Sequence, residues 1–83
     1  MDILHQKIIK SEELVNGGSY SEAKEILVDI LQSYDPNSID AANNLAAVEM
    51  FLGNFAEAVS LLEQILTRDP SNIIAIENLN FIN

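Results

Sequence analysis

The side chains that most often carry catalysis are sparse in this chain and poorly placed for joint action. His5 is the only histidine, and Asp2 lies one helical turn before it; we interpret both as exposed polar residues of a terminal helix. Glu12 and Glu13 are adjacent, so on a helix their carboxylates point in different directions and cannot act as a pair. The serines lack the setting of a nucleophile elbow. We therefore expect no catalytic residue and no enzyme.

Cofactor and metal sites are not predicted either. Gly17 and Gly18 lack the preceding strand and the spacing of a phosphate-binding loop. Asp35 and Asp69 are interpreted as loop acids that cap helices, because a calcium loop needs many more oxygen ligands. The chain has no cysteine, which excludes disulfides and thiolate metal sites.

Charge and hydropathy narrow the class of partner. Thirteen acidic residues against four basic ones give a net charge of −9. Binding to nucleic acid needs a basic patch, so we expect neither nucleic acid nor an anionic membrane as a partner, whereas basic or neutral proteins would be attracted. No signal peptide and no run of apolar residues long enough to span a bilayer is found. With the absence of cysteine, these features favour a cytoplasmic location.

The chain repeats itself at a period of 34 to 35 residues. Segment 35–39 returns as 69–73, and segment 18–23 returns as 53–58. Apolar residues follow the spacing of a helix in both copies and align at 35 residues. These residues are Ala23, Ile26, Leu27, Ile30 and Leu31, matched by Ala58, Leu61, Leu62, Ile65 and Leu66. Such a period is typical of stacked helical repeats.

Glycine and proline signals divide the chain into helices. Ser19 with Glu22, and Asn54 with Glu57, have the spacing of a capping box at a helix start. The linkers are short, so neighbouring helices must lie antiparallel. The sequence predicts a single all-α domain over 1–83 with five helices, at about 2–16, 19–34, 38–52, 54–68 and 72–83.

The signature positions of this unit resemble the tetratricopeptide repeat family. The second repeat carries Leu45, Ala46, Ala58, Leu62 and Pro70 at the family's places, but Ala42 and Glu49 replace its Trp and Tyr. The first repeat is more degenerate, with Lys7 and Lys10 where the pattern has Trp and Leu and one extra residue near 33–34. The resemblance implies a short right-handed α-solenoid of two repeats (about 4–38 and 39–72) and a final helix, 73–83.

The resemblance also implies a non-catalytic protein–protein interaction module, or alternatively a docking or regulatory segment of a larger, even enzymatic, protein. In this family the first helix of each hairpin lines a concave surface where extended peptides lie. By that resemblance the partner-binding residues here are Glu12, Asp40, Asn43, Asn44, Ala47, Phe51, Asn78 and Phe81. The first helix would add His5 and Ile9, and the last Ile74 and Glu77.

Asn44 and Asn78 occupy the same place in successive repeats. Some family members use such asparagines as a ladder that hydrogen-bonds the backbone of a peptide; the alternative is that they only satisfy packing and solvent. Members that clamp the C-terminal carboxylate of chaperones use lysines and an arginine here, with asparagines. Only Asn44 fits that pattern, and the other matching places hold Ile8, Glu12, Ile74 and Asn78. We therefore expect no chaperone tail to bind.

The last predicted helix is apolar almost all round, although a terminal helix of a solenoid normally has a polar outer side. Two explanations stay open: the natural chain continues past Asn83, or the helix packs against another copy. Under the second explanation the self-association face consists of Ile74, Phe81 and Ile82, and the protein is a homo-oligomer.

Overall fold

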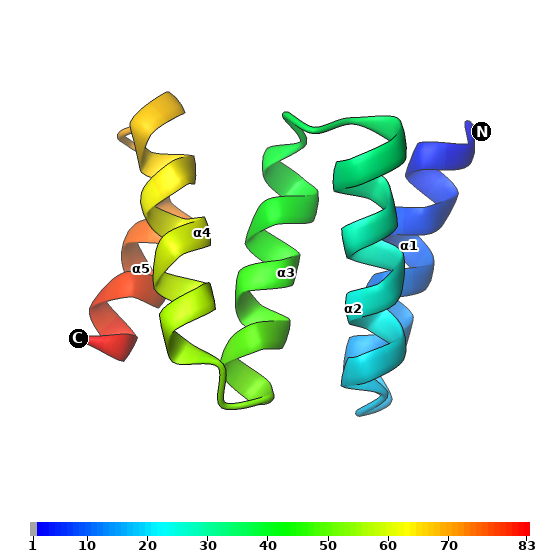
Figure 1. Cartoon of the computed structure of the whole chain (residues 1–83), viewed down its shortest axis with the longest axis horizontal. Coiled ribbons are helices and arrows are strands. Elements are labelled where there is room, and N and C mark those ends of the chain that lie inside the picture. Colours follow the sequence, from blue (N-terminus) through cyan, green and yellow to red (C-terminus); the bar gives the residue numbers. More distant parts are fainter. Residues whose placement is uncertain (1) are drawn as a thin grey trace.

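The computed structural model describes residues 2–83, and within that range it contains helices and no strand. The elements are α1 (Ile3–Asn16), α2 (Tyr20–Asp29), the π-helical segment η1 (Ile30–Tyr34), α3 (Ile39–Phe51), α4 (Phe55–Arg68) and α5 (Ile73–Ile82). The predicted all-α fold is confirmed, and each predicted helix bound lies within one residue of the observed one when α2 and η1 are taken together as the second helix. Successive helices run antiparallel, so α1, α3 and α5 point the same way (Figure 1).

The two hairpin turns are closed in the same way, 35 residues apart. Gly18 has φ +81° and Gly53 has φ +84°, the left-handed region where glycine carries no steric penalty. In each turn the glycine N–H donates three residues back, and the next N–H donates five residues back, which is the Schellman motif. The predicted helix stop at these glycines is therefore confirmed.

The predicted capping boxes are wrong. Ser19 and Asn54 are the N-caps of α2 and α4, but neither side chain caps its helix. A capping box needs the N-cap backbone N–H as the donor to the glutamate three residues on. Here the N–H of Ser19 already donates to Leu14 O at 2.8 Å, and that of Asn54 to Glu49 O at 2.8 Å. Because the turn is so short, the N-cap residue of the second helix uses its backbone N–H to bond the C-terminal end of the preceding helix. That N–H is then unavailable to the glutamate of a capping box.

Side-chain N-caps occur instead at α1, α3 and α5, each of which is the first helix of its repeat. The side chains of Asp2, Ser38 and Asn72 accept from the backbone N–H three residues on, at 2.8, 3.1 and 3.0 Å. Asp35 and Asp69 do cap helices, as the C-caps of η1 and α4, but through their backbone N–H and not through their carboxylates. Their carboxylates stabilise the turns before α3 and α5: Asp35 accepts from the N–H of Asn37 at 3.0 Å, and Asp69 from the amide of Asn72 at 3.1 Å.

The extra residue of the first repeat is accommodated at the end of its second helix. There α2 continues into η1, and the N–H of Asp35 donates to Ile30 O, five residues earlier. At the end of α4 the matching N–H of Asp69 donates to Ile65 O, four residues earlier. A π-turn contains one more residue than an α-turn. The insertion therefore widens one turn and leaves the following Asp–Pro turn unchanged.

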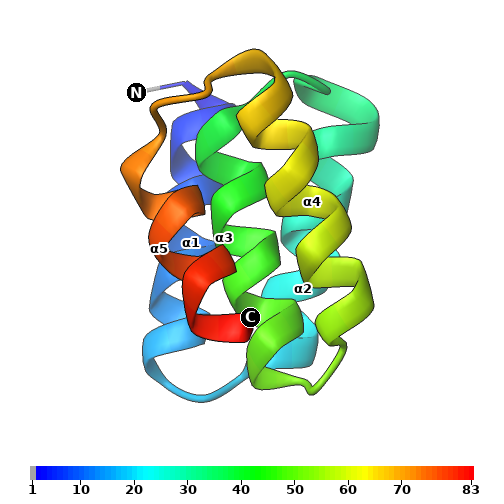
Figure 2. The same ribbon diagram turned by 90° about the vertical axis from the view of Figure 1, so that its left-hand side faces the viewer.

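The helix α3 lies between two clusters of buried side chains. Its Leu45 and Val48 join Ala23 and Leu27 of α2 and Ile30 of η1 in the first cluster. Its Ala42 and Ala46 join Leu62 and Ile65 of α4 and Ala75 of α5 in the second. Figures 1 and 2 show α2 and α4 on one side of α3, and α1 and α5 on the other. This arrangement is a short α-solenoid of two hairpins and a final helix.

Candidate functional site

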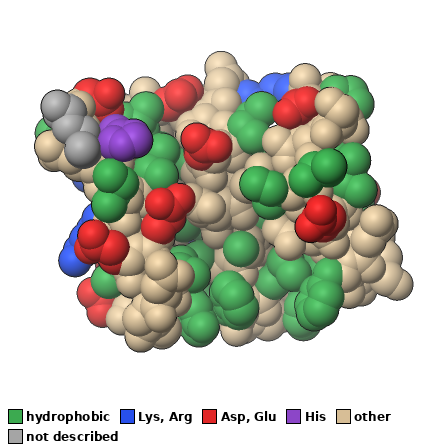
Figure 3. Space-filling model, turned by 180° about the vertical axis from the view of Figure 1, so that it is seen from behind, with side chains coloured by type: hydrophobic (Ala, Val, Ile, Leu, Met, Phe, Trp, Pro, Cys, Tyr) green, Lys and Arg blue, Asp and Glu red, His purple; other side chains and the backbone are tan. Residues whose placement is uncertain are grey.

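The first helices of the repeats, α1, α3 and α5, together form one face of the molecule, which we call the concave face. α3 is recessed between α1 and α5 when the molecule is seen edge-on (Figure 2). In Figure 3, which views this face, acidic side chains spread over its upper and middle parts, and hydrophobic side chains gather along its lower edge and in its upper right part. Along α3 the face changes from acidic at the start, with Asp40, to apolar at the end, with Phe51, whereas α5 exposes Ile73 and Ile74 at its start.

The middle of the concave face joins the first repeat to the second. Asn44 of α3 donates through Nδ2 to Oε2 of Glu12 on α1 at 3.4 Å. Both side chains border a hollow of about 180 Å³, whose other walls are Val15, Asn16 and Ala47. The structure therefore brings together three of the residues that sequence reasoning assigned to this face. The amide oxygen of Asn44 has no protein donor among residues 2–83.

The asparagines of the predicted binding set differ in exposure. Asn78 on α5 is half-buried, and no hydrogen bond within residues 2–83 connects it to Asn44. Asn43 is only 5% exposed, and its amide donates to Oδ1 of Asn72, the cap of α5, at 3.2 Å. Its own Oδ1 is buried without a partner in the described chain. Asn43 thus connects α3 to α5, and we leave it out of the binding surface.

The lower edge of the concave face carries the two most exposed predicted anchors. Phe51 at the end of α3 is 59% exposed although one side of its ring stacks on Tyr20, with centroids 4.8 Å apart. Phe81 near the end of α5 is 78% exposed. Of the predicted self-association residues, Ile74 is also exposed, whereas Ile82 is half-buried against the second cluster.

A second hollow, of about 470 Å³, lies at the upper edge, where α1 and α3 begin. Three carboxylates border it, from Asp2, Asp35 and Asp40, of which only Asp40 was predicted as a binding residue. Its apolar wall consists of Leu4, Ile8 and Ile39, and the exposed His5 completes the rim. Asp35 belongs to the loop before α3, so a reading based on the helix faces alone missed it.

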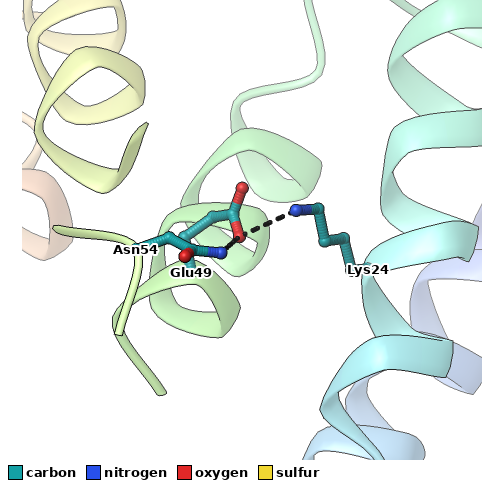
Figure 4. Close-up of polar contacts among 3 residues, drawn as sticks. All are labelled: Lys24, Glu49 and Asn54. Atoms are coloured by element: carbon teal, nitrogen blue, oxygen red, sulfur yellow. Dashed lines mark hydrogen bonds and ion pairs between the residues drawn. The ribbon is translucent and has the colours of Figure 1, made fainter. Parts of the chain in front are cut away.

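A polar link on the opposite side of α3 was also missed (Figure 4). Oε1 of Glu49 lies 3.2 Å from Nζ of Lys24 on α2 and accepts from Nδ2 of Asn54 at 3.0 Å. The Glu49 side chain is only 6% exposed, and that of Lys24 is 37% exposed. The sequence did contain a signal for this link, because Glu49 stands at the position where the tetratricopeptide repeat pattern has Tyr. A charge at a core position indicates a partner.

Lys7 of α1 contacts Asp29 at the end of α2 and Tyr34 of η1. Its Nζ lies 3.1 Å from Oδ2 of Asp29 and 5.1 Å from the centroid of the Tyr34 ring. The hydrogen bond to Asp29 raises the pKa of Lys7 above its usual value, whereas desolvation acts in the opposite direction. Tyr34 lies in η1, so the π-turn places this ring over the ammonium group.

No group of three or more His, Cys, Asp or Glu side chains is placed to hold a metal ion within residues 2–83. No helix in the same range combines the length and the apolar character needed to cross a membrane. The candidate functional site is the face formed by α1, α3 and α5.

Comparison with known proteins agrees with the geometry. A family model described as tetratricopeptide repeat matches residues 14–79, from the end of α1 into α5. No curated protein and no solved structure matches the chain. Such repeats generally mediate protein–protein interaction and are typically non-catalytic. With the period, the paired Schellman turns and the stacked hairpins, the match over most of its length shows that this chain belongs to the tetratricopeptide repeat family.

Proposed function

We propose that the concave face binds an extended segment of a partner protein and that the chain acts as a non-catalytic interaction module. One observation carries the proposal: Phe51 and Phe81 are 59% and 78% exposed on the same face. Large aromatic side chains are favoured anchors of protein interfaces because they bury much apolar area at low entropic cost. A bound segment would cover them.

The side-chain amides of Asn44 and Asn78 can supply the polar contacts to a bound segment. The free Oδ1 of Asn44 can accept from the backbone N–H of a ligand, and Asn78 can donate and accept. The bond to Glu12 holds Asn44 across the hollow between α1 and α3. Because an amide recognises backbone rather than side chains, this pair favours an extended segment without prescribing its residues.

The proposal is tested by selecting ligands from a random peptide library on the intact protein. Each recovered peptide is then measured by fluorescence anisotropy against two variants, Phe81→Ala and the double variant Asn44→Ala/Asn78→Ala. We expect affinity to fall about tenfold or more in each, the range of an interface anchor. The matched control is Phe55→Ala, since Phe55 is also exposed but begins α4, outside the concave face. Unchanged affinity in both test variants would remove the proposal.

A second candidate function, self-association through α5, is favoured by a separate observation. Ile73 and Ile74 are exposed at the start of α5 and Phe81 near its end, and Glu77 is the only charged residue of the helix. A two-fold contact between copies of α5 would bury these side chains and bring few like charges together. The net charge of −9 opposes such association, so the dimer would strengthen with salt.

Light scattering after size exclusion, across protein concentration, tests this candidate. If it is right, the wild-type chain is a dimer and Ile74→Lys is a monomer. The matched control is Ile3→Lys on α1, because Ile3 and Ile74 are 57% and 56% exposed. A wild-type monomer, or an unchanged dimer in Ile74→Lys, would contradict self-association through α5.

A further inference from the structure

The partner's chemistry can be inferred from the charges of the concave face, provided that the proposed binding there holds. α3 and α5 carry no lysine or arginine. Three of the four cations of the chain are engaged elsewhere: Lys7 with Asp29, Lys24 with Glu49 and Arg68 with Asn37. The fourth, Lys10, is exposed on α1. The carboxylates of the concave face therefore meet no cation from α3 or α5.

The upper hollow is suited to a long cationic side chain. The carboxylates of Asp2 and Asp35 are held in place, since each accepts one backbone N–H, at 2.8 and 3.0 Å. A carboxylate has about four acceptor positions, so both keep most of their capacity, and Asp40 adds a third carboxylate. Lysine and arginine pack their aliphatic stems on apolar surface while the charged head stays with polar groups. Leu4 and Ile39 offer such a surface.

The lower edge of the concave face is suited to apolar ligand side chains. Phe51 and Phe81 are exposed there, and Ala47 and Val15 form part of the adjoining hollow. α3 has 13 residues, so the two edges lie about 20 Å apart at about 1.5 Å per residue. An extended segment covers that distance in about six residues, at about 3.3 Å each.

We propose that the partner of the concave face is a bipartite segment about six residues long. Lysine or arginine at one end occupies the hollow between Asp2, Asp35 and Asp40. Bulky apolar residues at the other end pack on Phe51 and Phe81. The charge complementarity sets both the class of partner and the direction in which it lies along the helices.

Three labelled eight-residue peptides test the proposal by fluorescence anisotropy on the intact protein. The probe has three arginines at one end and leucine, phenylalanine and leucine at the other, and the two comparison peptides replace the arginines by glutamines or by glutamates. We expect the arginine peptide to bind at least about tenfold more tightly than the glutamate peptide at low salt, with the difference shrinking at about 0.3 M NaCl.

The location of the charge effect is tested with isosteric variants. Asp35→Asn/Asp40→Asn should weaken binding of the arginine peptide about fivefold, the size expected when two partly exposed charge contacts are lost. Glu57→Gln/Glu63→Gln removes the same charge from α4, outside the concave face, and should leave affinity nearly unchanged. Circular dichroism confirms that both variants remain folded. Equal losses in the two variants would overturn the proposal, because they would reflect net charge alone.

The outcomes also separate this inference from the proposed function. If the arginine peptide binds no better than the others, or not at all, the bipartite partner is wrong. If the random library still yields neutral or acidic ligands that depend on Phe81, binding at the concave face stands. If the library yields no ligand that depends on Phe81, both proposals fail.

Discussion

The two hairpins of this protein, α1–α2 and α3–α4, are built alike at the turn and in the core and differ at the end of their second helices. The turn glycines Gly18 and Gly53 correspond at a spacing of 35 residues, and the buried residues Leu27 and Leu62 correspond at the same spacing. After that, one hairpin closes with a π-turn and the other with an α-turn. A repeat can thus absorb an extra residue where it does not disturb the stacking surface.

A second difference separates the two terminal helices. α1 carries Lys7, Lys10, Glu12 and Glu13 in addition to His5, whereas α5 carries only one charged residue. Both helices belong to the concave face and lie at the two ends of the row of hairpins (Figure 1), where α1 packs mainly on α2 and α5 mainly on α4. The outer surface of α1 is therefore polar and well solvated, whereas that of α5 exposes apolar side chains.

The largest effect is expected from breaking the link between the hairpins. Lys24→Met removes the cation that faces the carboxylate of Glu49, which is 6% exposed. The carboxylate then keeps only Asn54 as a partner, and we expect a loss of about 2 kcal/mol in the free energy of unfolding, measured by urea denaturation. Since Lys24 is itself partly exposed, solvent screening keeps the loss below that of a fully buried pair.

Two controls accompany that variant. Lys10→Met removes a lysine that is exposed on α1 and should change stability little. The double variant Lys24→Met/Glu49→Met should recover part of the loss, because no buried charge is left unpaired. Equal stability of Lys24→Met and wild type would show that the hairpins do not depend on this link.

A smaller effect tests whether the two turns are equivalent. Gly18→Ala and Gly53→Ala each place a Cβ at positive φ, with no clashing atom nearby, so we expect about 1 kcal/mol from each. Thermal unfolding measured by circular dichroism gives the comparison. The matched control is Gly17→Ala, which should be neutral or stabilising because Gly17 has φ −86°. Clearly unequal losses at Gly18 and Gly53 would mean that the hairpins respond differently to the same strain.

The smallest effect concerns the contact of Lys7, which only the first hairpin has. Because the hydrogen bond to Asp29 raises the pKa of Lys7 in the folded state above its ordinary value of 10.5, its stabilisation is fully present below that ordinary value and is lost as pH rises through the higher folded pKa. The melting temperature of Lys7→Met should therefore lie slightly below that of wild type at neutral pH, and the gap should close in strong alkali. A gap that persists there would assign the effect to packing on Tyr34.

Most of the fold could be predicted because its signals are local. Helical spacing of apolar residues, glycine at the turns and proline after the second helices each act within a few residues, and all five helices were found. The predicted capping boxes failed because local spacing does not reveal that the N–H of Ser19 is already bonded to Leu14. For the concave face, the pattern selected α1, α3 and α5 and their exposed Phe51 and Phe81. It missed Asp2, which is the N-cap of α1, and Asp35, which lies in the loop before α3.

By itself, the sequence determined the repeat, its period and the family, since these depend on which residue types recur along the chain. Only the tertiary structure decided how single polar side chains are used. Asn43 and Asn44 are neighbours of one type, yet one is buried against the cap of α5 and the other bonds Glu12 across a hollow. Successive residues of a helix point in directions about 100° apart. Which of them faces a neighbouring repeat and which faces solvent is therefore settled by how the helices pack.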